Sequence, residues 1–159
     1  MLHPNRFKSA NFECKILLVL LKQRAVAKSY FMIQELKDHY GHTFEEELLN
    51  EIAQVGTFKE VPAGYTMMAI GDYIRGVPLL ISGAIKVMRE DKEGDELLLY
   101  YLESGETCSM TMTCCMGHTK SEIKAVAEQD TKLIMVPVQK MEEWKRSNIF
   151  EKNPTKFHL

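Results

Sequence analysis

The sequence lacks a marked excess of charge of either sign. Its 20 lysines and arginines are offset by 22 aspartates and glutamates, which gives a formal net charge of −2. A surface that binds a nucleic-acid duplex needs a basic face, because neutralising the backbone phosphates supplies most of the non-specific affinity. The overall charge therefore gives no indication of nucleic-acid binding.

Long apolar runs are also absent. The longest uninterrupted run is Ile16 to Leu21, flanked by Lys15 and Lys22, whereas a membrane-spanning helix needs roughly 20 apolar residues. No small-residue cleavage site follows the run before the next charges, so it does not match a secretory signal. We expect this run to lie in a buried amphipathic helix of a cytosolic protein without a membrane segment.

The signatures of common catalytic sites are missing. The sequence contains no HExxH motif, no glycine-rich phosphate loop and no serine within a nucleophile-elbow pattern. Glu142 and Glu143 are adjacent in a helical segment, so they cannot face one substrate together. An enzyme of the cupin type would need metal-binding histidines on its strands, and the predicted strands contain none. We therefore expect a protein that is not an enzyme.

Cysteines are few and poorly placed for disulfides. Three of the four, Cys108, Cys114 and Cys115, lie within eight residues, and the fourth is Cys14. Adjacent cysteines rarely bridge each other because the geometry is strained. Reduced thiols, as in cytosolic proteins, are the simpler interpretation.

The first third of the chain is helical in pattern. Residues 11–28 lack glycine and proline, and residues 30–40 place apolar side chains at helical spacing before Gly41. Thr43 and Glu46 have the spacing of a capping box, which predicts the start of a third helix that Gly56 would end.

From Thr57 to about Pro137 the pattern changes to short β-rich runs separated by turn residues, which is typical of a β-sandwich or barrel. A closing helix is predicted over Val138–Lys145, and a polar tail follows over 146–159. The predicted strands are Tyr65–Ile70, Val77–Ile81, Ala84–Arg89, Glu96–Leu102, Ile123–Ala127 and Lys132–Val136.

The turn glycines occur in an order that resembles a known family. Pro62-Ala63-Gly64, Gly71-Asp72 and Ser82-Gly83 are followed by Glu93-Gly94-Asp95 and by Ser104-Gly105-Glu106. This series is similar to the effector domain of the Crp/Fnr transcription regulators. The resemblance implies a mainly β fold with flanking α: a double-stranded β-helix (jelly-roll) barrel over 44–145, with N-terminal helices over 1–43 and a C-terminal closing helix.

The same resemblance implies a ligand pocket. In relatives that bind cyclic nucleotides, a Gly-Glu pair opens a helical cassette, and Gly105 and Glu106 match that pair. The phosphate-binding Arg-Ser-Ala falls on Ser121, Glu122 and Ile123. Serine lacks the guanidinium fork that phosphate recognition favours, so no phosphate arginine is predicted and we expect a ligand other than a cyclic nucleotide. The predicted pocket residues are Gly105, Glu106, Thr107, Cys108, Lys120 and Ser121.

Two alternatives stay open for the ligand. Lys120 and Lys124 could replace the arginine as point charges in a genuine cAMP- or cGMP-binding domain. The chain could instead be a protein-interaction module that kept the barrel and lost the pocket.

The family's long dimer helix and helix-turn-helix would follow the barrel. The residues after Trp144 are too few for both, so we do not expect this chain alone to bind DNA. A homodimer and a small-molecule effector are compatible with the resemblance.

The sulfur-rich segment 108–118 has three interpretations. Cys108, Cys114, Cys115 and His118 could hold a metal or face a haem, or a thiol pair could act as a redox switch. The spacing does not match the paired cysteines of structural zinc sites. Methionine and free cysteine are also common core residues, so packing without any cofactor is the third interpretation.

Overall fold

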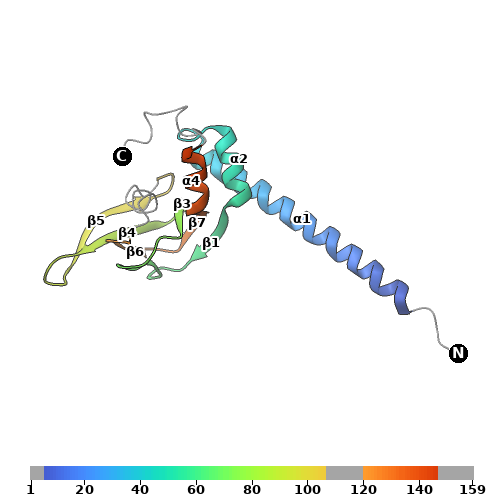
Figure 1. Cartoon of the computed structure of the whole chain (residues 1–159), viewed down its shortest axis with the longest axis horizontal. Helices are drawn as coiled ribbons and strands as arrows, with labels where there is room; N and C mark the ends of the chain where they lie inside the picture. The colour runs from blue at the N-terminus through green and yellow to red at the C-terminus, as the bar shows by residue number, and fades with distance from the viewer. Residues whose placement is uncertain (1–5, 107–119, 147–159) are drawn as a thin grey trace.

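The computed structural model describes residues 6–106 and 120–146. These residues form helices at both ends and two antiparallel sheets between them (Figure 1). The elements are α1 (Arg6–Tyr40), α2 (Glu46–Val55), β1 (Thr57–Val61), β2 (Thr66–Met68), β3 (Gly76–Ser82), β4 (Ala84–Glu90), β5 (Glu96–Glu103), β6 (Lys124–Ala127), β7 (Thr131–Pro137) and α4 (Val138–Arg146). No helix in the described part of the chain is long and apolar enough to cross a membrane.

The helix α1 is continuous, whereas the sequence predicted two helices. Ser29 does not interrupt it, because neither glycine nor proline occurs between residues 6 and 40. The helix ends at the predicted place, where Gly41 N donates to Lys37 O at 3.0 Å.

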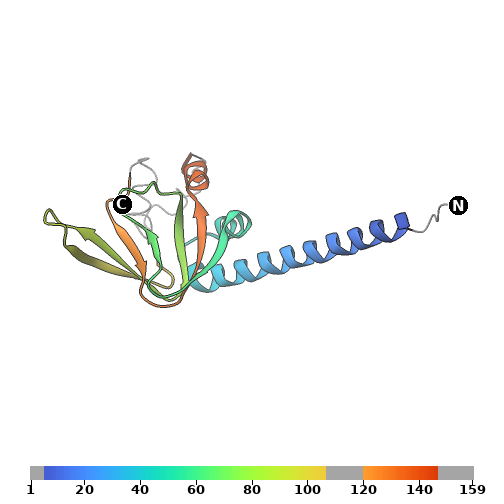
Figure 2. The same ribbon diagram turned by 90° about the horizontal axis from the view of Figure 1, so that it is seen from below.

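Only the C-terminal part of α1 is buried. Met32, Leu36 and Tyr40, spaced four residues apart, are at most 2% exposed. The N-terminal part projects away from the sheets (Figures 1 and 2), and Leu17 and Val19 are more than half exposed. The prediction that the run 16–21 is buried is therefore wrong for these side chains, because no other described element packs against this part of α1.

The start of α2 also differs from the prediction. Thr43 N donates to Tyr40 O at 2.9 Å, so Thr43 still belongs to the turn that ends α1. The helix is instead preceded by Glu45, whose side chain forms no capping hydrogen bond. The predicted capping box is therefore wrong, although the predicted end of the helix at Gly56 is confirmed.

The strands form a three-stranded sheet, β1-β7-β3, and a four-stranded sheet, β2-β6-β4-β5. All six predicted strands are present, with ends that differ by a few residues. The sequence missed β1, which pairs antiparallel with β7. Among the described residues the ladders form two separate sheets, not one closed barrel.

Within the three-stranded sheet, β3 is buried on both faces. In β3, Leu79 and Ile81 pack on the helices, while Leu80 faces the other sheet, as the two-residue period of a strand requires. Figure 2 shows α2 and α4 covering the outer side of this sheet. The helices cover the outer face of the sheet, so its inner face borders the space between the two sheets.

Gly83 links β3 to β4 at a point where no side chain fits. Its φ is +95°, and an added Cβ would lie 2.7 Å from the Cα of Thr131. The family-like turn at Ser82-Gly83 is thus required by a close backbone approach as well as by the left-handed conformation.

Candidate functional site

A cavity of about 530 Å³ lies between the two sheets. Cavities of this size hold small organic molecules. Its described lining residues come from both sheets and from the loop before β3. They are Lys59, Met67, Met68, Gly71, Asp72, Tyr73, Ile74, Arg75, Gly76, Pro78, Ile85, Val87, Leu102, Ala125 and Met135.

The cavity combines an apolar wall with a few charged residues. The facing sheets supply buried side chains such as Ile85, Val87 and Leu102. Asp72, Arg75 and Lys59 also line it. The carboxylate of Asp72 already accepts a hydrogen bond from Ala69 N at 2.9 Å, which closes the turn before the loop.

The loop over 71–76 forms one side of the cavity. Its backbone is bound by Lys120 and Ser121, two of the residues that the sequence predicted for the ligand pocket. Ser121 N donates to Asp72 O at 2.8 Å, and Gly71 N donates to Ser121 O at 2.8 Å. Tyr73 and Lys120 form an isolated antiparallel bridge. The segment that matches the family's phosphate position therefore supports the cavity loop through its backbone.

The side chain of Ser121 turns toward its own backbone. Its hydroxyl donates to Ile123 O at 2.8 Å and accepts from Ile123 N at 3.1 Å. The residue is 2% exposed. Both hydrogen bonds of the Ser121 hydroxyl are therefore made within a local turn. The side chain offers no positive charge to a phosphate.

The two lysines considered as substitutes for the arginine have other partners. Lys120 Nζ lies 5.6 Å from the centroid of the Tyr73 ring, a cation–π geometry. Lys124 Nζ donates to Glu96 Oε1 at 2.5 Å. Neither residue is among the described residues that line the inter-sheet cavity.

Gly105 and Glu106 lie in a tight turn at the end of β5. Gly105 has a φ of +81°, and Glu106 N donates to Glu103 O at 3.1 Å, which is the geometry of a type II turn. The Glu106 carboxylate accepts from Glu103 N at 2.9 Å. This turn is not among the described residues that line the cavity, so the structure places the Gly-Glu pair and the Lys120-Ser121 pair against different neighbours.

The same turn is bound by the end of α1. The buried Tyr40 hydroxyl is 3.0 Å from Leu80 O and 2.9 Å from Glu106 O, so the two carbonyls share its single proton in a three-centre hydrogen bond. Burial raises the pKa of the Tyr40 phenol well above its ordinary value. Tyr40 therefore stays protonated and joins β3 to the turn after β5.

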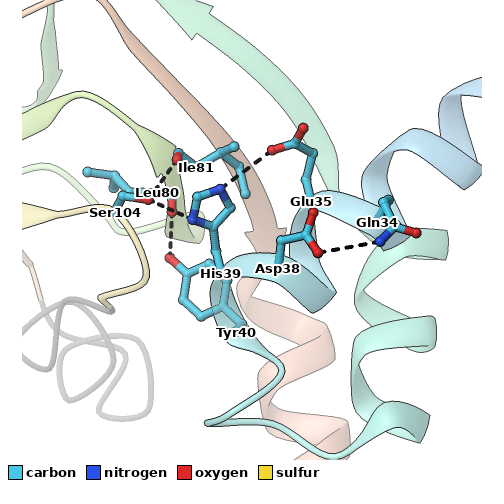
Figure 3. A network of polar contacts seen from close by, with 8 residues as sticks. All are labelled: Gln34, Glu35, Asp38, His39, Tyr40, Leu80, Ile81 and Ser104. Atoms are coloured by element: carbon cyan, nitrogen blue, oxygen red, sulfur yellow. Dashed lines mark hydrogen bonds and ion pairs between the residues drawn. The ribbon is translucent and has the colours of Figure 1, made fainter.

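A second contact beside it is formed by His39 and Ser104 (Figure 3). Ser104 Oγ donates to Ile81 O at 2.7 Å and lies 2.9 Å from His39 Nδ1, while His39 Nε2 lies 3.6 Å from Glu35. A catalytic triad would need the serine proton to point at the imidazole. Because Ser104 gives its one proton to Ile81 O, this group anchors the turn and does not activate a nucleophile.

The remaining predicted site residues, Thr107, Cys108, Cys114, Cys115 and His118, lie outside the described residues. Their proposed redox, metal or packing roles stay predictions. In ranges 6–106 and 120–146, no group of three or more His, Cys, Asp or Glu side chains is arranged to hold a metal ion.

Sequence reasoning missed the loop 71–76 as part of a site. The available signal was an aromatic residue and an arginine, Tyr73 and Arg75, enclosed between the turn glycines Gly71 and Gly76. That pattern indicates a short loop beside a strand, with side chains that can bind a ligand. Its position over the cavity depends on strand pairing that the sequence does not show.

Solved structures share this fold. The Thermus thermophilus catabolite activator protein is 22% identical over 70% of this chain and 52% of its own, with a TM-score of 0.59. The regulatory subunit of a cAMP-independent protein kinase A from Trypanosoma cruzi, bound to guanosine, is 14% identical over 81% and 45%, with a TM-score of 0.68.

A related Trypanosoma brucei subunit has been solved as a variant with three substitutions, one of them threonine to arginine, bound to cAMP. It is 14% identical over 85% of this chain and 53% of its own, with a TM-score of 0.66. The chain spans about half the length of the solved structures it matches. No curated protein sequence matches it significantly.

The predicted mainly β jelly-roll fold with flanking helices is confirmed by these likenesses. At the level of sequence, the model of the cyclic nucleotide-binding domain matches residues 58–148. This range is more than half of the chain, and the chain therefore belongs to the cyclic nucleotide-binding domain family.

Proposed function

We propose that this chain is a ligand-sensing regulatory domain, not an enzyme, whose effector occupies the inter-sheet cavity without a phosphate arginine at residue 121. Binding of the effector would favour one of two positions of α4. The shift of α4 would be the signal that the domain transmits. Such a shift requires the ligand to bind the two states with different affinity.

The observation that carries this proposal is the contact between the cavity loop and α4. Ile74 lines the cavity and also belongs to a small cluster with Val77, Val138 and Met141. Arg75 O accepts from Val138 N at 3.2 Å, and Val138 is the first residue of α4. A molecule that displaces the loop must therefore act on the start of the closing helix.

Neighbouring structures are described with cAMP and with guanosine, and the guanosine complex is a precedent for an effector other than a cyclic nucleotide. One trypanosomal subunit is described as cAMP-independent and bound to guanosine, and a variant of another with an introduced arginine is bound to cAMP. In this chain the resemblance of the turn sequences puts the phosphate arginine at Ser121, whose hydroxyl is held by Ile123. We infer that cAMP and cGMP are not its effectors.

We further propose a cytosolic role in transcriptional regulation, as in the Crp/Fnr proteins. Homodimer formation stays a prediction of the same kind. These proposals derive from family membership and from the resemblance of the turn sequences.

A second candidate, the protein-interaction module, is favoured by β5. This strand lies at the edge of its sheet and exposes Leu97, Leu98, Leu99 and Tyr101. Exposed edge strands of this composition are common sites of partner binding. The presence of a cavity of about 530 Å³ argues for the sensing function as the first choice.

Thermal unfolding with cyclic nucleotides tests the nucleotide part of the proposal. A ligand at about 100 times its Kd adds roughly 2.7 kcal/mol, which raises the midpoint of a chain of this size by about 5–10 °C. We expect no shift with saturating cAMP or cGMP. A clear shift would contradict the inference from Ser121 and favour recognition through Lys120 or Lys124.

Binding of a neutral apolar probe tests the cavity itself. N-Phenyl-1-naphthylamine, which fluoresces in apolar surroundings, is expected to bind the wild type and to protect the amides of 71–76 and 138–144 from hydrogen exchange. Ala125→Phe, which fills the cavity, should abolish both effects. The control Ala63→Phe changes an exposed alanine that does not line the cavity and should leave both effects intact.

A further inference from the structure

Arg75 is an unpaired cation at the cavity. It is exposed, it lines the space between the sheets, and no acidic side chain of the described residues lies within 4.0 Å of its guanidinium. Lys59, from the facing strand β1, lines the cavity as well and is likewise without an ion pair in the described part of the chain. The cavity is therefore bordered by two cations that the protein itself does not neutralise.

The cations of the four-stranded sheet, by contrast, are neutralised. Lys86 pairs with Glu128 at 3.2 Å, Arg89 with Glu122 at 3.5 Å and Lys124 with Glu96 at 2.5 Å. Asp72 is the one acidic residue among the described lining residues, and its Oδ2 accepts from Ala69 N at 2.9 Å. In a chain with a net charge of −2, this local positive excess stands out as a feature of the cavity.

We propose that the effector is an organic anion, with an apolar or aromatic body between the sheets and one acidic group held by Arg75. The inference deepens the proposed sensing function and depends on it. A guanidinium binds a carboxylate or sulfonate through two parallel hydrogen bonds, which fixes orientation as well as charge. The apolar body is recognised by the side chains of both sheets, among them Met68, Val87 and Leu102.

The backbone of Arg75 connects this charge to α4. Arg75 O accepts from Val138 N, and the next residue, Gly76, is in register with Pro137, the last residue of β7. An acid captured by Arg75 would thus act at the junction of β3, β7 and α4. A ligand that filled the cavity without an acidic group would lack this direct contact.

A pair of matched probes tests the proposal with the whole chain. 8-Anilinonaphthalene-1-sulfonate and N-phenyl-1-naphthylamine have the same aromatic body, but only the first carries an acidic group. Arg75→Gln is expected to weaken binding of the sulfonate at least about tenfold, because it removes a charged hydrogen bond, and to leave the neutral probe within about twofold. Arg75→Lys should restore part of the loss.

Two controls keep the outcome specific. Arg89→Gln removes an exposed arginine that pairs with Glu122 and does not line this cavity, so it should change neither affinity. Ala125→Phe should remove the binding of both probes, which separates cavity binding from adsorption to the exposed residues of β5.

The results distinguish the two proposals. If both probes bind the cavity and Arg75→Gln weakens neither, or both equally, the anion proposal is overturned while the sensing function stands. If neither probe binds the wild type, the cavity does not accept ligands, and the sensing function is overturned together with the anion proposal.

Discussion

The two sheets of this domain are packed in different ways. The sheet β1-β7-β3 is covered by α1, α2 and α4, and its helix-facing side chains belong to the larger of the two main apolar clusters. The sheet β2-β6-β4-β5 contributes a smaller cluster, borders the cavity, and leaves Leu97, Leu99 and Tyr101 of its edge strand exposed. The comparison indicates that the first sheet, packed under three helices, serves as framework, whereas the second has fewer contacts on its outer side.

The difference follows from where the helices pack. Leu36, Leu49 and Trp144, from three helices, join one cluster with Ile134 and Val136 of β7. None of the described helices covers the outer side of β5 in this way (Figure 2). A region with fewer buried contacts opens at lower free energy, so the second sheet should open more readily than the first.

The largest effect should come from leucine truncation in the framework. Leu36 is fully buried beneath the covered sheet, so Leu36→Ala should cost about 3–5 kcal/mol. Leu102→Ala, at the cavity wall, should cost less, because Leu102 already borders empty space. Urea unfolding of both variants measures the two losses in the free energy of unfolding. Equal losses would contradict the inferred difference in packing between the sheets.

A smaller effect is expected from Tyr40→Phe, which removes the bridge between the sheets. The Tyr40 hydroxyl shares its proton between Leu80 O in one sheet and Glu106 O just after the other. We expect a loss of about 1–3 kcal/mol, with faster hydrogen exchange over 103–106 and unchanged exchange in β7. Equal acceleration in β7 would show that Tyr40 supports the whole framework and not the junction.

The smallest effect concerns an ion pair at the surface of the framework. Lys37 Nζ lies 2.6 Å from Glu46 Oε1, and this hydrogen bond, together with the charge of Lys37, lowers the pKa of Glu46. Because the folded pKa is below the unfolded one, the contribution to stability is present above the unfolded value and is lost as the pH falls through the folded value.

An NMR titration of the Glu46 carboxyl measures this shift, and Lys37→Gln should return its pKa toward the ordinary value. A wild-type pKa at or above the ordinary value would contradict the ion pair. Since both side chains are exposed to solvent, the effect should also weaken with added salt.

Much of the fold could be predicted from short runs of residues, because turn glycines and β-branched residues act locally. Gly41 and Gly56 end helices where expected, and Gly83 has a conformation that glycine tolerates. The strand Thr57–Val61 was missed because it is partly exposed and carries Lys59 and Glu60 in place of alternating apolar residues.

The site was harder to predict because the cavity is built from residues far apart in the chain. Ser121 was identified by its match to a family position, and the structure shows where its hydroxyl bonds. Arg75 has no such match, and only the pairing of β3 with β7 reveals its place beside the cavity and α4. A loop of this kind cannot be located by a local pattern.

The packing of α4 has a practical consequence. Trp144 is the only tryptophan of the chain, it is 3% exposed, and its indole Nε1 donates to Glu51 of α2. Indole emission depends on the polarity and hydrogen bonding around the ring. Any effector that separates α4 from α2 would therefore change the intrinsic fluorescence of the unlabelled protein, so the domain carries its own optical reporter at the helix through which the signal would leave.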